Sequence, residues 1–457
     1  MNSIRDISSF LSKISKQTKY VDLRYGNIEE RIINSINGSI IKDIRTAYSG
    51  YGIRFLSKGI ISFTSAPELQ IAYEDINKLL KTSNIIATWK KGVSKLCDAP
   101  IIQATTTKTP KKDWENLEKS EIKQIITDIE NYIREKLKIK VRIEIDLLFI
   151  KWSEVFRNSE GTSIFQSYPY TVMTLTGRLS ENGNQRLYYK NFGGLGGLEV
   201  LPYDDLEKLD EFIQIVNNLP YAKNVGTSNY NVVLNEDIAW ILTHEVLGHS
   251  LEADNVLSGH SFYAGLQGMK IAPSYVSVID DPYLETIGYY EFDSEGMKGR
   301  GTLLVDDGIL TDFLHSRETA AAMGGESSAN YRAYSFEHLP QVRMSNTFIE
   351  PKDFSFEELL EQVKNGIYIC DGYGGSSEPQ TGDFNIDSQY AREIKNGELG
   401  GYLRGVQLTG KISQTLSLIK GIGDRLLAQP GSCVKNNQRI FTGSVSPKIA
   451  IFDQRVS

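Results

Sequence analysis

The most informative part of the sequence is the stretch His244-Glu245-Val246-Leu247-Gly248-His249-Ser250-Leu251-Glu252, which places two imidazoles and two carboxylates within about three turns of one helix. Asn235 can cap this helix, and the acidic pair Glu236-Asp237 suits the positive end of its dipole. A buried apolar stripe at helical spacing follows: Ile238, Ile241 and Leu242. Two imidazoles beside carboxylates on an apolar helix are the residue types of a metal-dependent hydrolase.

The two histidines of this stretch form the pattern His-Glu-x-x-x-His. On a regular helix, residues five apart point about 140° from each other, whereas residues four apart differ by only about 40°. Two ligands of one ion cannot diverge so far. We therefore predict that the helix is widened or broken between His244 and His249, with Gly248 as the weak point. A single π-turn would return both imidazoles to one face.

The third ligand of such a site is open. A histidine is more often an ordinary core or surface residue, but two of the 5 histidines here flank a glutamate on an apolar helix. A catalytic zinc usually takes three protein ligands and leaves a fourth position for water. Glu252 is the nearest candidate, and its rival is Cys433, which ends the turn-forming stretch Gln429-Pro430-Gly431-Ser432-Cys433. Cys97 and Cys370 lack such a setting and are predicted to be small hydrophobic residues.

Further motifs follow the histidine stretch. They are Gly268-Met269-Lys270-Ile271-Ala272 before Asp280-Asp281, Asp293-Ser294-Glu295-Gly296 before Leu304-Val305-Asp306-Asp307-Gly308-Ile309-Leu310, His338-Leu339-Pro340-Gln341-Val342-Arg343-Met344-Ser345-Asn346-Thr347, and Gly374-Gly375 before Thr381-Gly382-Asp383-Phe384. With these motifs the chain resembles the TldD/PmbA family of metallopeptidases, specifically its TldD-type, metal-carrying branch. The resemblance is strong from about Asn231 onward. Before it, only Tyr51-Gly52-Ile53-Arg54 and Gly59 resemble the family's first hairpin.

The resemblance implies a set of site residues and partners. His244, His249 and Cys433 become the metal ligands. Glu245 becomes the catalytic carboxylate, and Glu252 becomes a residue that orients a ligand imidazole, or an alternative ligand. The resemblance also implies a dimer, either with a metal-free PmbA-like paralogue or with a second copy of the chain. The dimer would enclose the site and admit small unfolded peptides.

These residues suit peptide-bond hydrolysis. A bound divalent ion polarises the scissile carbonyl and lowers the pKa of its water, while Glu245 accepts the water proton and passes it to the departing amine. We expect one Zn²⁺ per chain, and Fe²⁺ suits the same ligand types. The alternative function is a non-catalytic peptide-binding or assembly subunit, the role suggested for PmbA-type members without the motif. Retention of Glu245 favours the enzyme, and the physiological substrate cannot be read from the sequence.

Length and composition bear on the number of domains, the partners and the location of the protein. A chain of 457 residues exceeds what one hydrophobic core usually supports, so we predict two domains, residues 1–222 and 223–457. Lys+Arg 50 against Asp+Glu 57 gives a net charge of -7, which argues against a nucleic-acid partner. No long apolar run and no secretory signal is evident, so no membrane association is expected. Three cysteines fit a reducing compartment, and we predict a cytoplasmic protein.

The sequence predicts an α+β fold, in which a mixed α/β N-terminal domain precedes a strand-rich, barrel-like C-terminal domain that carries the metal-binding helix. The predicted helices cover residues 3–15, 68–81 and 114–137. The predicted strands cover residues 140–148, 171–175 and, in a small antiparallel sheet, 20–25, 52–55 and 59–63. The domain boundary lies near the polar stretch 220–229, and short β runs with turns such as Asp307-Gly308 follow the metal helix.

Two glycine clusters and two tyrosines also carry predictions. Phe192-Gly193-Gly194-Leu195-Gly196-Gly197 lacks the spacing of a dinucleotide fingerprint and is predicted to be a flexible turn. Gly372-Tyr373-Gly374-Gly375-Ser376 is either a tight turn or a backbone contact to a peptide. Tyr331 and Tyr334 are candidates for contact with the substrate.

Overall fold

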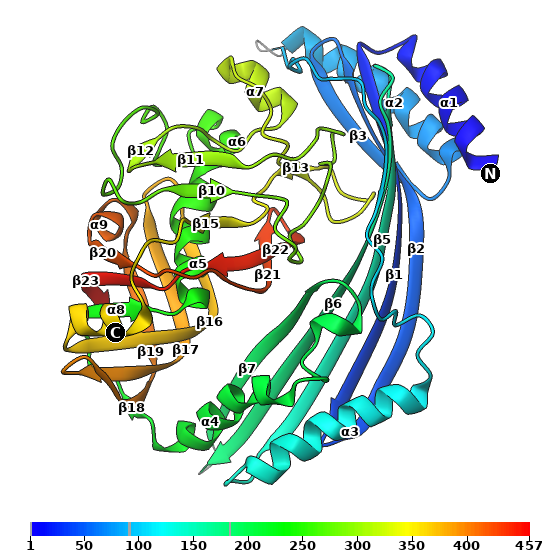
Figure 1. Cartoon of the computed structure of the whole chain (residues 1–457). Coiled ribbons are helices and arrows are strands. Elements are labelled where there is room, and N and C mark those ends of the chain that lie inside the picture. Colours follow the sequence, from blue (N-terminus) through cyan, green and yellow to red (C-terminus); the bar gives the residue numbers. More distant parts are fainter. Residues whose placement is uncertain (1, 90–92, 182–183) are drawn as a thin grey trace.

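A seven-stranded sheet forms the first part of the chain. The structure, a computed structural model, describes residues 2–89, 93–181 and 184–457. The strands are β1 (Tyr20–Ile36), β2 (Ser39–Ser57), β3 (Ile60–Ala66), β4 (Gln103–Thr107), β5 (Arg142–Asn158), β6 (Ser163–Glu181) and β7 (Asn184–Leu195). They lie in the order β3-β2-β1-β5-β6, and both β4, in parallel, and β7, antiparallel, pair with β6. Figure 1 shows a long, curved sheet.

This sheet is much larger than the small sheet that the sequence predicts. The strand β1 has 17 residues and β2 has 19, whereas the predicted runs inside them have only four to six. The apolar runs are short, but β1 pairs along most of its length with β2 on one side and β5 on the other. Hydrogen bonds to the neighbouring strands therefore keep polar residues of low β propensity in the strand conformation.

Four helices pack at the two ends of this sheet, as Figure 1 shows. The helices α1 (Asn2–Ser15) and α2 (Leu69–Trp89) bury their apolar faces against strand residues such as Phe55. The helices α3 (Lys119–Lys136) and α4 (Asp210–Asn218) do so against residues such as Phe149. The three predicted helices are confirmed, but α3 begins later than residue 114. Its start is set by the Glu121 carboxylate, which accepts a hydrogen bond from Glu118 N.

The second part of the chain contains a closed barrel of five strands. They are β9 (Ser228–Leu234), β16 (Gly366–Glu378), β17 (Asp383–Lys395), β19 (Val406–Lys411) and β23 (Ile449–Val456). The strands pair in the order β16-β9-β23-β19-β17, and β17 pairs back to β16. The strands β8 (Lys223–Asn224), β18 (Glu398–Arg404) and β20 (Ile419–Ile422) extend this sheet. The predicted α+β fold with a barrel-like C-terminal part is confirmed, while the division at residues 222 and 223 stays a prediction.

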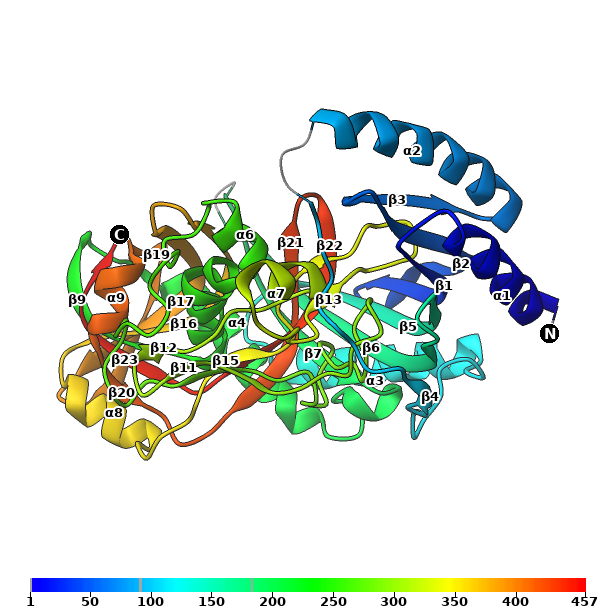
Figure 2. The ribbon, with the colours of Figure 1, turned by 90° about the horizontal axis from the view of Figure 1, so that it is seen from above.

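Shorter elements surround the barrel. The strands are β10 (Val278–Asp280), β11 (Thr302–Asp306), β12 (Ile309–Leu310), β13 (Tyr331–Arg332), β14 (Gln341–Val342), β15 (Thr347–Ile349), β21 (Leu427–Lys435) and β22 (Gln438–Ser446). The helices are α5 (Glu236–Thr243), α6 (Ala253–Leu257), α7 (Arg317–Met323), α8 (Phe356–Val363) and α9 (Ile412–Ser417). The hairpin of β21 and β22 lies between the barrel and the long sheet, where β21 contacts β7 (Figures 1 and 2). Every helix in the described ranges is too short or too polar to cross a membrane.

Buried charges join the two parts of the chain. Arg54 on β2 donates to Glu295 Oε1 at 2.6 Å, and both residues belong to motifs that carry the family resemblance. Arg24 on β1 donates to the carbonyl oxygens of Ser335 and His338, at 3.4 Å and 2.7 Å. Removing one partner of a buried ion pair costs about 3–5 kcal/mol, so these contacts fix how the sheet and the C-terminal part meet.

Candidate metal centre

The histidine motif lies on a helix that widens where the sequence predicts. The helix α5 is capped by Asn235, whose Oδ1 accepts a hydrogen bond from Ile238 N at 3.0 Å. A single π-turn, His244–Gly248, follows it. His249 N donates to the carbonyl of His244, five residues back along the chain, which is the hydrogen bond of a π-helix. The predicted widening between the two histidines is confirmed.

Gly248 is required at the end of the π-turn by the residue that packs against it. A Cβ atom at this position would lie 1.9 Å from the Sδ atom of Met344 and 2.9 Å from its Cε atom. Carbon and sulfur atoms cannot approach so closely. A side chain at this position therefore fits only if the buried Met344 or the widened helix shifts.

We expect Gly248→Ala to weaken metal binding, because the added methyl group displaces either Met344 or the turn that carries both imidazoles. Overpacking of this kind also costs about 1–3 kcal/mol of stability. The double variant Gly248→Ala/Met344→Ala should recover metal affinity, since it removes the atoms that the methyl group meets. Metal titration of the three proteins measures the effect. Wild-type affinity in the single variant would contradict the prediction.

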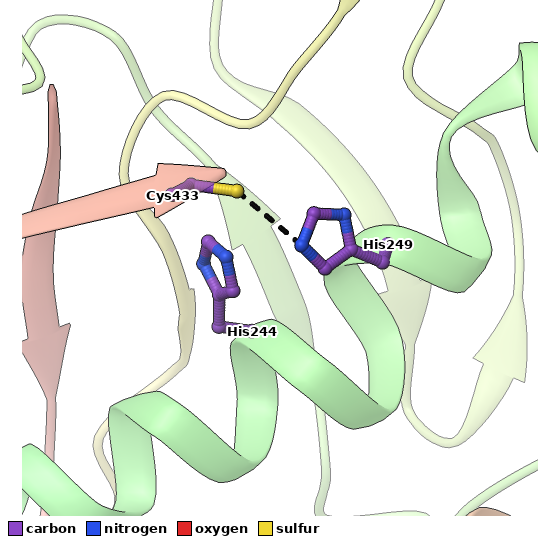
Figure 3. Close-up of side chains that lie close together, drawn as sticks. All are labelled: His244, His249 and Cys433. Carbon is purple, nitrogen blue, oxygen red and sulfur yellow. Dashed lines mark hydrogen bonds between the residues drawn. The ribbon is translucent and has the colours of Figure 1, made fainter. Parts of the chain in front are cut away.

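The three predicted ligands converge at one point (Figure 3). Candidate ligand atoms of His244, His249 and Cys433 all lie within 4.8 Å of one another. Cys433 Sγ is 3.3 Å from His249 Nε2, although the two residues are 184 positions apart in the chain. His244 and Cys433 are only 4% and 3% exposed. Cys97 and Cys370 are free cysteines outside this group, partly exposed and buried, as predicted.

The charges around Cys433 favour its thiolate. Burial by itself raises the pKa of the Cys433 thiol, but the imidazoles of His244 and His249 bring that pKa well below its ordinary value. Burial likewise lowers the pKa of His249, but the carboxylate of Glu252 and the thiolate of Cys433 raise that pKa well above its usual value. The thiolate is the form of cysteine that binds metals, so these side chains together suit a cation.

Glu252 contacts His249 on the side away from Cys433. Its Oε2 atom accepts a hydrogen bond from His249 Nδ1 at 3.1 Å, whereas His249 Nε2 faces the thiol. Lys435 Nζ donates to the same oxygen at 3.0 Å and to Asp254 at 2.8 Å. Burial raises the pKa of Glu252, but Lys435 and His249 lower it to about 2. This arrangement favours Glu252 as the residue that orients His249 over Glu252 as a ligand.

The three residues border a pocket of about 570 Å³. Its walls come from residues 189–191 of β7, from α5 and its π-turn, from residues 372–377 of β16, and from residues 429–435 of β21. Glu245 lines the pocket beside His244, and its Oε2 atom accepts a hydrogen bond from Ser377 Oγ at 2.9 Å. The long N-terminal sheet therefore contributes one wall of the site, through β7.

The glycine cluster at residues 372–376 lines this pocket. Of its two predicted alternatives, the tight turn is wrong, and the backbone contact to a peptide stays a prediction. These residues belong to β16. A Cβ atom on Gly372 would lie 2.1 Å from Ile241 Cδ1, and one on Gly375 would lie 2.6 Å from Ile241 Cγ2. The glycines let the strand approach α5 closely, and this approach brings Ser377 to Glu245.

The other glycine cluster and the two tyrosines are not among the residues that line the metal pocket. Residues 192–195 continue β7, which pairs with β6 as far as Leu195, so the predicted flexible turn is wrong there. Tyr331 is buried with the guanidinium of Arg54 4.9 Å from its ring centre, and Tyr334 donates its hydroxyl hydrogen bond to Glu30. Neither tyrosine lines the metal pocket, and contact of either with a substrate stays a prediction.

Three parts of the site were not predicted from the sequence: Lys435, Ser377 and residues 189–191. Lys435 could have been found, because it lies two residues after Cys433 and side chains two apart on a strand share a face. Ser377 and residues 189–191 could not, because only the pairing of distant strands brings them to the pocket.

Comparisons with known proteins give a consistent set of relatives. Residues 227–457 match the PmbA/TldA metallopeptidase C-terminal domain. Over 448 residues, 97% of each chain, the sequence is 30% identical to a metalloprotease of Methanothermobacter thermautotrophicus. Over 242 residues, 52% of this chain and 53% of the relative, it is 31% identical to a zinc metalloprotease TldD homologue of Saccharolobus solfataricus. The solved structure of TldE from Thermococcus kodakarensis has the same fold, with a TM-score of 0.75 and 16% identity over 99% of each chain.

Proposed function

Because the chain belongs to the PmbA/TldD family of metallopeptidases, we propose that it hydrolyses small unfolded peptides with Zn²⁺ held by His244, His249 and Cys433. One observation carries this proposal. Two imidazoles and a thiol from distant parts of the chain lie within 4.8 Å of one another, beside Glu245, at the edge of a pocket. The name of the Saccharolobus solfataricus relative, a zinc metalloprotease homologue, supports zinc.

The residues present fit such an ion. Histidine nitrogen and cysteine thiolate are both ligand types of zinc, three protein ligands suit a catalytic site, and the lowered pKa of Cys433 makes the thiolate available. When bound, the ion supplies Lewis acidity, polarising the scissile carbonyl and activating a water molecule. Fe²⁺ accepts the same ligand types.

Glu245 acts as the general base in this proposal. Its carboxylate accepts the proton of the attacking water and then donates it to the departing amine. The hydroxyl of Ser377 holds one carboxylate oxygen, Oε2, and so limits rotation of the side chain. Glu245 Oε1 makes no hydrogen bond to any residue that the structure describes, so it is the oxygen available for proton transfer.

The strand β16 suits the binding of an extended peptide. It pairs with β17 along its length, but its other edge pairs with β9 only at residues 367–369. Among the described residues no strand pairs with the rest of that edge, although Gly372 N donates to Asp237 and the carbonyls of residues 372 and 373 accept hydrogen bonds from Tyr189. The part of the edge that can take a peptide is therefore residues 374–377, which line the pocket. A peptide added there would be held by its backbone, which requires an unfolded substrate and tolerates many side chains.

The proposal predicts metal-dependent cleavage of unstructured peptides. We expect the purified chain to cut an unstructured peptide mixture, to stop cutting when a chelator removes the metal, and to resume when Zn²⁺ is restored. A stable globular protein in the same assay should stay intact, because it offers no extended segment. Mass spectrometry of the products measures both results, and cleavage that persists after complete metal removal would refute the proposal.

The same cleavage experiment distinguishes a peptidase from the alternative function, a non-catalytic peptide-binding subunit. A metal-loaded chain that binds peptides without cutting them, alone and with a PmbA-like relative, would be the non-catalytic subunit instead. We further propose that the chain works as a dimer, with such a relative or with itself, which sedimentation of the active sample would test. We place it in the cytoplasm, where the free thiol of Cys433 stays reduced, and cell fractionation would test that.

A further inference from the structure

The segment Arg343-Met344-Ser345-Asn346-Thr347 is a motif that the proposed chemistry does not use. We propose that Arg343 is a positioning residue for the metal centre. Its guanidinium holds the backbone of Cys433 so that the thiolate meets the two imidazoles. This inference rests on the proposed ligand set of His244, His249 and Cys433. The cobalt-binding experiment separates a failure of the inference from a failure of that ligand set.

The guanidinium of Arg343 forms hydrogen bonds with both strands of the hairpin that carries Cys433. The residue is 0% exposed. Its Nη2 atom donates to the carbonyl of Cys433 at 2.9 Å, and its Nη1 atom donates to the carbonyl of Gln438 at 3.0 Å. Cys433 lies on β21 and Gln438 on β22, near the turn that joins them. One planar group therefore ties both strands of the hairpin at the level of the ligand.

The segment that carries Arg343 is itself firmly held. Arg343 N donates to the carbonyl of Asn330 at 2.8 Å, and Asn330 Nδ2 donates to the carbonyl of Arg343 at 3.1 Å. The buried carboxylate of Asp280 accepts hydrogen bonds from Ser345 N, Ser345 Oγ and Thr347 Oγ1, at 2.8, 2.6 and 2.6 Å. Hydrogen bonds therefore hold the backbone that carries the Arg343 guanidinium in place, as a positioning residue requires.

The same segment also contacts the half of the site that carries the histidines. Met344, the next residue, packs directly against Gly248 at the end of the π-turn. Two consecutive residues therefore reach the two halves of the ligand set, the hairpin and the widened helix. This short connection links the hairpin to the widened helix at the place where Cys433 Sγ lies 3.3 Å from His249 Nε2.

The contacts of Arg343 indicate a geometric role. Within the described part of the chain, Arg343 forms no ion pair within 4.0 Å, and its two side-chain hydrogen bonds go to backbone carbonyls. Its positive charge also helps to lower the pKa of Glu252, and a lysine would keep that charge. Lysine has a single nitrogen and no planar fork, so it cannot hold two carbonyls in the same geometry. Arg343→Lys keeps the positive charge but cannot form both hydrogen bonds to the carbonyls of Cys433 and Gln438.

The test compares Arg343→Lys and Arg343→Gln with a matched control, Arg24→Lys. Arg24 is also buried, at 2% exposure, and also donates to two carbonyls, those of Ser335 and His338, but it lies outside the metal pocket. Each full-length protein is loaded with Co²⁺. The thiolate-to-cobalt absorption band reports the bond to Cys433, and competition with a chelator gives the Co²⁺ affinity.

We expect both Arg343 variants to lose affinity by roughly 10- to 100-fold, the usual range for a residue that orients a ligand, and to show a weaker or shifted thiolate band. Arg24→Lys should match the wild type in both measurements even where its melting temperature falls. An unchanged band and affinity in a folded Arg343 variant, or an equal loss in Arg24→Lys, would overturn the proposal. A wild-type protein without a thiolate band would instead overturn the ligand set on which it rests.

Discussion

Replacing Glu245 with glutamine is expected to reduce peptide cleavage by about two or more orders of magnitude, the range of a lost general base, while the metal content stays at the wild-type level. Glutamine keeps the size of the side chain and an oxygen that Ser377 can hold, but it cannot accept a proton from water. The measurements are kcat/KM on an unstructured peptide and elemental analysis of the protein.

Glu236 offers a matched control for this variant. It lies at the start of the same helix, pairs with Lys448 and is outside the pocket. Glu236→Gln should therefore cleave peptides at the wild-type rate. Full activity in metal-loaded Glu245→Gln would remove Glu245 from the mechanism.

Cys433→Ser should lose most of its bound metal, and with it the peptidase activity. A serine hydroxyl stays protonated at neutral pH and is a far poorer ligand than the thiolate that His244 and His249 stabilise. Cys97→Ser is the control, because Cys97 is a free, partly exposed cysteine outside the ligand group. Elemental analysis gives the ion content of each protein. Wild-type occupancy in Cys433→Ser would point to Glu252 as the third ligand instead.

The local part of the site could be predicted because it depends on short-range geometry. The five-residue spacing of His244 and His249 requires a widened helix, and the structure has a π-turn at that place. The barrel could be expected from many short strands with turns between them. The meeting of Cys433 with the histidines had a weaker local signal, a turn-forming stretch, and depended mainly on family resemblance.

The rest of the site depends on long-range pairing that local patterns do not encode. The glycines at 372 and 375 resemble a turn in the sequence, but they are strand residues that pair with β17. They are glycines because α5 packs too closely for a side chain. The long strands β1 and β2 extend through polar residues because their neighbours continue the ladder. For the same reason, nothing in the sequence signals that residues 189–191 form a wall of the metal pocket.

The distance along the chain between the two halves of the ligand set has a consequence for the newly made protein. During synthesis the histidine helix emerges first, and the hairpin with Cys433 follows 184 residues after His249. Chains fold in this order as they are made, so a partly synthesised chain holds two imidazoles without the thiolate. The candidate ligand set is then complete only when the late hairpin docks between the barrel and β7.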